Sequence, residues 1–136
     1  MSDRSSEISA MGHFMLPDVK GNMKKKNFRP AKYGDTCLEE MLRLLDENGC
    51  RRTMIIAKAA GGASMFRRFD NRTILDIARR NIFSLRTNLA RLQVPLVAED
   101  LGGTRGRTIT FYPRENRLNI KILDNISENG YRYVDI

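Results

Sequence analysis

One apolar stripe at helical spacing lies in the first half of the 136-residue chain. Leucine and methionine side chains recur three and four positions apart between Leu38 and Leu45, which is the spacing of one helix face. Asp35 precedes the stripe as a candidate cap, and Gly49 follows it as a stop signal. The pattern therefore predicts a helix over about 36–48 with one buried side.

A second stripe of the same kind lies further along the chain. Apolar residues step by three and four positions from Ile82 to Leu92, whereas the arginines of this stretch fall mostly on the other faces. We therefore expect a second helix over about 77–92, with its leucines toward a core and its arginines toward solvent.

Short apolar or alternating runs between and after these stripes predict strands. The run 53–57 is mostly apolar, which suits a buried strand, and a further strand is expected over 94–98, with a proline near its start. The runs 108–112 and 118–122 alternate between apolar and polar residues on either side of a turn, and so predict a hairpin. Two main helices packed on mixed sheets make the predicted fold class α/β.

Length and composition limit the class of protein further. A chain with 41% apolar and 29% charged residues suits one globular domain, which we expect to span residues 1–136. The polar residues from about 124 to 136 are expected to form a loosely attached tail. No run approaches 18 apolar residues and the first residues lack the pattern of a secretory signal, so membrane insertion is not expected.

The net charge of +8 favours acidic partners, which include nucleic acids and acidic protein surfaces. The chain contains no nucleic-acid motif and does not interleave its basic residues with aromatic ones, so a nucleic-acid partner is not expected. The triple lysine 24–26 lies in a polar stretch, 21–33, that is typical of an exposed loop.

Few residues offer chemistry. His13 is the only histidine, and imidazole is well suited to moving protons near neutral pH, although a lone histidine among apolar residues is more often a packed side chain. Cys37 and Cys50 are too few and too scattered in sequence to form a disulfide framework or a zinc site, so no metal is expected. Two unpaired cysteines also favour a reducing, cytoplasmic setting. The glycine segments 61–63 and 102–107 lack the Gly-Lys-Ser/Thr ending of a phosphate-binding loop. Each segment either forms a plain turn or donates backbone amides to an oxyanion.

Six segments over about residues 3–121 have an order and spacing in common with one known family. They are 12–17 (GHFMLP), 32–35 (KYGD), 48–51 (NGCR), 57–66 (AKAAGGASMF), 80–81 (RN) and 95–107 (PLVAEDLGGTRGR). Taken together and in this order, they resemble the CheD family of chemoreceptor glutamine deamidases.

The resemblance implies a fold similar to the deamidating domain of cytotoxic necrotizing factor toxins, and a cysteine hydrolase without cofactor or metal. Such an enzyme converts glutamines of methyl-accepting chemotaxis receptors to glutamates and releases ammonia. A thiolate attacks the amide carbon, a histidine moves protons, and backbone amides hold the oxyanion. The family's histidine falls on His13, which is therefore the expected general base and acid. The implied partners are the receptors and CheC, a phosphatase.

The chain departs from the family pattern at the nucleophile. In the family this is a cysteine in a Leu-Gly-Ser-Cys segment, further upstream of the histidine than the twelve residues that precede His13 here. The leading hypothesis is that Met1 is an internal methionine and that the true start lies upstream. We would then expect the 136-residue chain to be less stable than a complete member, because a sheet strand would be missing.

The missing nucleophile is also compatible with two further hypotheses. In one, the chain is a non-catalytic CheD-like module that binds CheC or receptors and performs no hydrolysis. In the other, the scaffold supports a different activity, for which Cys37 or Cys50 has been recruited as the nucleophile.

Overall fold

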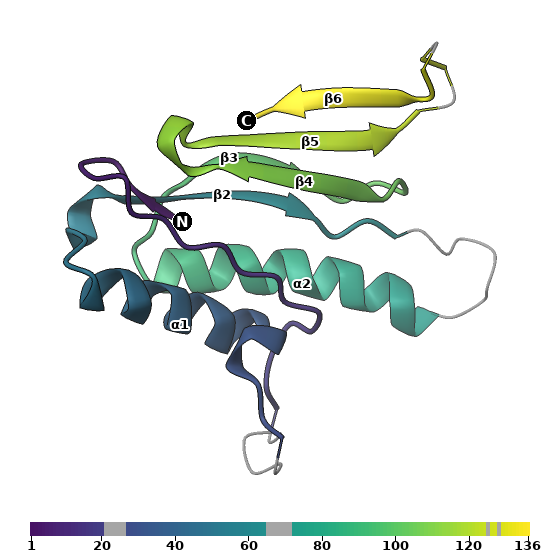
Figure 1. Ribbon diagram of the computed structural model, residues 1–136. Helices are drawn as coiled ribbons and strands as arrows, with labels where there is room; N and C mark the ends of the chain where they lie inside the picture. Colours follow the sequence, from purple (N-terminus) through teal and green to yellow (C-terminus); the bar gives the residue numbers. More distant parts are fainter. Residues whose placement is uncertain (21–26, 65–71, 125, 128) are drawn as a thin grey trace.

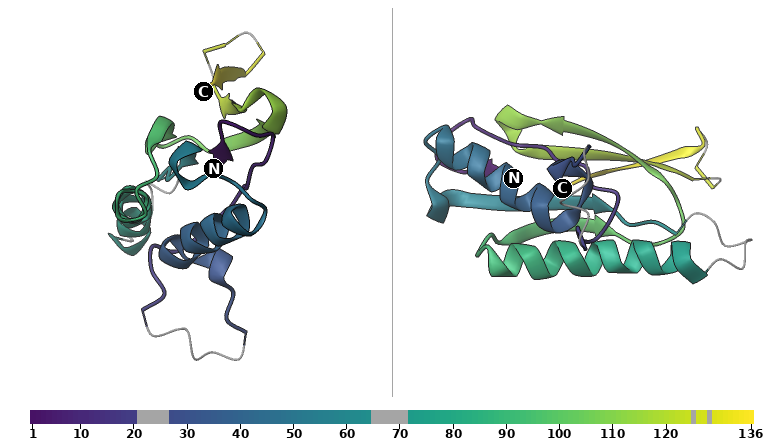
Figure 2. Two further views of the ribbon diagram at one scale, coloured as in Figure 1. Left: turned by 90° about the vertical axis from the view of Figure 1, so that its left-hand side faces the viewer. Right: turned by 90° about the horizontal axis from the view of Figure 1, so that it is seen from below.

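Two helices and two three-stranded sheets form the described part of the chain, which confirms the predicted mixed α/β class. In the computed structural model both helices lie on one side of the first sheet, and the second sheet lies on its other side (Figure 1). Seen from below, α2 runs along the length of the strands (Figure 2). The structure describes residues 1–20, 27–64, 72–124, 126–127 and 129–136.

Helix α1 spans Gly34–Glu47 and buries the leucines of the first apolar stripe, as predicted. Asp35 is not its cap, contrary to expectation, because Tyr33 occupies that position and Asp35 lies in the first turn. There the Asp35 carboxylate accepts a hydrogen bond from the backbone N–H of Val19 at 3.1 Å. The acidic side chain therefore holds an earlier loop against the helix instead of capping the helix N-terminus.

Helix α2 spans Arg72–Arg91, so it begins before the predicted residue 77. Its leucines at the centre of the second stripe, Leu85 and Leu89, are buried in the core. Apolar periodicity identifies a helix face but does not mark the residue at which backbone hydrogen bonding begins.

The first sheet has the order β1-β2-β3, with bounds Ser2–Asp3, Ile55–Gly61 and Leu96–Leu101. Strand β1 runs antiparallel to β2, and β2 runs parallel to β3 with α2 as the crossover between them. Strand β2 begins later than the run 53–57 suggests, because residues 52–54 form a 3-10 turn. It also ends later than predicted, at Gly61.

The second sheet has the order β4-β5-β6, with bounds Arg107–Tyr112, Arg117–Leu123 and Tyr131–Asp135. Strands β4 and β5 form the predicted hairpin. The expectation of a loosely attached tail from about residue 124 differs from the structure, in which β6 pairs antiparallel with β5 over five residue pairs. The polar composition of this segment does not reveal the backbone pairing that holds it.

The main core lies between the two helices and the first sheet. Its most completely buried side chains there are Leu42, Leu45, Ile55 and Leu89. The polar stretch expected as an exposed loop is only partly so, because Tyr33 is buried, while the triple lysine 24–26 lies outside the described residues. No helix in the described part of the chain is long and apolar enough to cross a membrane.

Candidate functional site

His13 lies on an irregular segment, residues 11–18, which we call the strap. The strap follows a short hairpin in which Met1 and Ala10 exchange two hydrogen bonds, at 2.8 and 2.9 Å between nitrogen and oxygen. The His13 side chain is exposed, and no hydrogen bond joins its imidazole to another described residue. Its position is therefore set by the strap that carries it.

The strap packs against α1 through a residue that has no side chain. A Cβ atom placed on Gly12 would lie 2.7 Å from the Sγ of Cys37 and 2.6 Å from the Sδ of Met41. Both distances are too short for real contacts, so a larger residue at this position would push the strap or the sulfur atoms aside. Glycine next to His13 therefore lets the backbone approach the helix closely.

Further along, the strap is held from two sides by main-chain and side-chain groups. The N–H groups of Met15 and Leu16 both donate to the carbonyl of Lys32, at 2.9 and 3.1 Å. From the other side, α2 reaches the strap through the side chains of Asn81 and Ser84, which donate to the carbonyls of Met15 and Pro17. The strap after His13 thus has little freedom to move.

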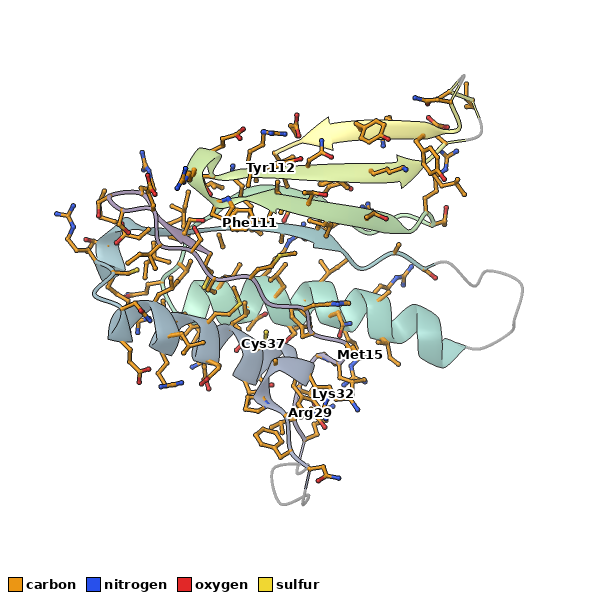
Figure 3. All side chains as sticks on the ribbon, viewed as in Figure 1. Met15, Arg29, Lys32, Cys37, Phe111 and Tyr112 are labelled. Carbon is orange, nitrogen blue, oxygen red and sulfur yellow. The ribbon has the colours of Figure 1, made fainter. Side chains whose placement is uncertain are left out.

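A cavity of about 200 Å³ lies beside His13, between the strap and the two sheets. Its walls come from the strap, from residues 57–62 of β2 and the following turn, from the facing sides of α1 and α2, and from the inward face of the second sheet. Phe111 of β4 lines it, whereas its neighbour Tyr112 is exposed on the sheet's other face (Figure 3). The polar side chains of the cavity wall are Ser2, His13, Lys58, Asn81 and Asn116.

The cavity follows an edge of β2 that is only partly paired. Strand β1 pairs with Ile55 and Ile56 alone, whereas β3 pairs with β2 along 57–61 on the opposite edge. The residues of β2 beyond Ile56 on the β1 side have no strand partner within the described ranges, and these same residues line the cavity.

Lys58 brings a positive charge to this cavity. Its ammonium group donates a hydrogen bond to the carbonyl of Asn116, in the turn between β4 and β5. The bond connects the first sheet to the second sheet's hairpin. An ammonium has three donors, so two remain for other groups at the cavity.

The two glycine segments meet beside α2. The N–H of Gly102 donates to the carbonyl of Gly61 at 2.8 Å, and the N–H of Ser64 donates to the carbonyl of Gly103 at 2.9 Å. A Cβ on Gly62 would lie 2.7 Å from Cγ1 of Ile82, so this turn also needs a glycine for close packing. Because the Gly102 amide is already engaged, that amide acts in a structural turn and is not free for an oxyanion.

Neither cysteine has the character of an activated nucleophile. Cys37 lines the cavity but is 2% exposed, and burial raises the pKa of its thiol. Cys50 lies away from the cavity wall, and burial likewise raises the pKa of its thiol. Among the described residues, no group of three histidine, cysteine, aspartate or glutamate side chains is placed to hold a metal ion.

Comparison with known proteins decides the family. A family model described as CheD chemotactic sensory transduction matches residues 15–122. This chain belongs to the CheD family. It is 41% identical over 119 residues to chemoreceptor glutamine deamidase CheD of Halalkalibacterium halodurans, an alignment that covers 88% of this chain and 73% of that protein. It is 34% identical over 119 residues to chemoreceptor glutamine deamidase CheD of Bacillus subtilis, an alignment that covers 88% of this chain and 71% of that protein.

A third CheD relative, a probable chemoreceptor glutamine deamidase from Symbiobacterium thermophilum, is 43% identical over 111 residues, covering 82% of this chain and 67% of that protein. The CheD resemblance of the six sequence segments is therefore confirmed. The family match begins at Met15, two residues after His13, so the catalytic role of His13 stays a prediction.

Some residues that shape this CheD site do not stand out in the sequence. Ser84 is one of them, because it is a polar residue outside the apolar stripe of the predicted helix and only the fold buries it. The ion pair of Asp100 and Arg107 is another, since Arg107 also donates to the carbonyl of Gly102 at 2.9 Å and so holds the glycine turn. Only the fold brings these groups to the cavity's surroundings.

Proposed function

We propose that this chain is a protein-glutamine deamidase that acts on methyl-accepting chemotaxis receptors in the cytoplasm. Membership of the CheD family supports this, because relatives at 34–43% identity are named chemoreceptor glutamine deamidases. The structural observation that carries the proposal is the placement of His13 at a cavity, on a strap that is anchored on both sides.

In the proposed mechanism His13 is the proton carrier. It accepts the proton of a cysteine thiol, which in the CheD pattern lies upstream of the histidine, and the resulting thiolate forms a bond to the amide carbon of the glutamine side chain. The protonated imidazole then gives this proton to the leaving nitrogen, so that the C–N bond breaks and ammonia departs. Water, deprotonated by the neutral imidazole, attacks the thioester; glutamate is released and the thiol is restored.

A second candidate function is a non-catalytic module that binds receptors or a CheC-type phosphatase. The observation that favours it is the state of the two cysteines, whose raised pKa values keep both thiols protonated at neutral pH. The net charge of +8 favours encounter with glutamate-rich receptor surfaces in the enzyme and in the binding module alike.

The deciding experiment measures ammonia release and the conversion of glutamine to glutamate in a receptor cytoplasmic fragment by mass spectrometry. The parent chain is compared with His13→Gln and with Cys37→Ser. Deamidation that His13→Gln abolishes supports the enzyme, and its retention in Cys37→Ser shows that Cys37 is not the nucleophile. Receptor or CheC binding without ammonia release supports the binding module.

A further inference from the structure

We propose that Asn81 is a positioning residue for His13, and this inference rests on the proposed deamidase function. Asn81 lies on α2, and its Nδ2 donates a hydrogen bond to the carbonyl of Met15 at 3.0 Å. Met15 follows His13 by two residues in the strap. The side chain of Asn81 therefore holds the strap only two residues after His13.

The orientation of the Asn81 side chain is fixed by chemistry. A backbone carbonyl only accepts hydrogen bonds, so the amide nitrogen must face Met15 and the Oδ1 atom must point elsewhere. That Oδ1 is buried and has no hydrogen-bond partner in the described part of the chain. A buried acceptor without a partner costs free energy, which is tolerated where a side chain serves function.

The location of Asn81 places this restraint at the site itself. Asn81 and His13 both line the cavity, whereas the Ser84 anchor acts further along the strap, at Pro17. No hydrogen bond from another described residue orients the His13 imidazole. The geometry of His13 relative to a bound glutamine therefore depends on how firmly the strap is held next to it.

The sharpest test is Asn81→Asp, which keeps the size of the side chain but replaces the donor by a carboxylate that repels the Met15 carbonyl. The matched control is Asn48→Asp, because the Nδ2 of Asn48 also donates to a backbone carbonyl, that of Leu44 at 2.8 Å, at the C-terminal end of α1 and outside the cavity wall. Both variants lose one such bond, but only the first loses it at the strap.

Two readouts separate positioning from general stability. The first is steady-state deamidation of the receptor fragment, for which we expect kcat of Asn81→Asp to fall about 10- to 100-fold with little change in KM, as for a small misplacement of a catalytic group. The second is NMR of the imidazole at fixed pH, which is unambiguous because the chain has one histidine. We expect shifted or doubled His13 signals in Asn81→Asp and parent-like signals in Asn48→Asp.

The outcomes also separate this inference from the proposed function. If the parent releases no ammonia, the deamidase proposal fails, and the NMR comparison still decides the role of Asn81. Parent-like His13 signals in a folded Asn81→Asp, or an unchanged kcat in an active protein, would overturn the inference. If thermal unfolding shows that Asn81→Asp does not fold, Asn81→Ala replaces it, since it removes the donor without adding a charge.

Discussion

The α-carbon of Gly12 lies so close to Cys37 that a Cβ atom at residue 12 would be 2.7 Å from the Sγ. Two segments that lie apart in the sequence, the histidine segment and the cysteine of the first helix, thus meet at one contact. The contact explains why the strap can approach α1 and why Cys37 is buried.

We predict that Gly12→Ala destabilises the protein by about 1–3 kcal/mol, because the added methyl group overlaps two sulfur atoms in a packed region. Denaturant unfolding measures this change. The double variant Gly12→Ala with Cys37→Ala should recover part of the loss, because it removes one of the two clashing atoms. Strictly additive effects of the two substitutions would contradict the contact.

The ion pair of Asp100 and Arg107 offers a second test. Its Arg107 side chain is 9% exposed, whereas the side chains of Arg43 and Glu40 on α1 are 51% and 38% exposed. We expect Asp100→Asn to cost about 3–5 kcal/mol, because it leaves a buried guanidinium without its charge partner. Glu40→Gln should cost clearly less, because an exposed ion pair contributes little to stability. The free energy of unfolding is measured by thermal or denaturant unfolding. Equal decreases in Asp100→Asn and Glu40→Gln would show that the pair of Asp100 and Arg107 is not effectively buried.

In a chain that begins at Met1, the amino group of this residue predicts a pH dependence of stability. Burial lowers its pKa from 8.0 to about 6 in the folded chain. Between these values the unfolded chain binds a proton that the folded chain does not, so the free energy of unfolding rises with pH from about 6 to 8. The gain approaches about 2–3 kcal/mol in total, because each pH unit contributes roughly 1.4 kcal/mol.

Denaturant unfolding at several pH values measures this gain in the 136-residue chain with a free Met1 amine. The control is the same chain acetylated at its amino end, which cannot titrate there. The difference in the free energy of unfolding between the two chains should change between about pH 6 and pH 8. A constant difference would mean that the amine is solvated in the folded state.

The two cysteines should differ in reactivity. Cys37 is 2% exposed and Cys50 is half-buried, and burial raises the pKa of each thiol. We expect an alkylating reagent at neutral pH to modify Cys50 first and Cys37 only after unfolding, with mass mapping of the labelled peptides as the readout. Rapid labelling of Cys37 in the native protein would revive it as a recruited nucleophile.

Several features of this protein follow from local sequence pattern. The buried stripes of both helices and the hairpin of β4 and β5 were predictable, because helical and strand periodicities depend on residues a few positions apart. His13 stood out because the chain contains no other histidine. The family could likewise be inferred from the order of short segments along the chain.

Other features were decided by tertiary structure alone. The bond from Asn81 to Met15 joins residues 66 positions apart, and the contact of the two glycine turns joins Gly61 to Gly102. The same is true of β6, whose polar residues pair with β5 although their composition suggested a loose tail. Periodicity records which face of an element is buried but not which distant element buries it. The cavity beside His13 therefore arises only when the strap, β2 and the second sheet come together.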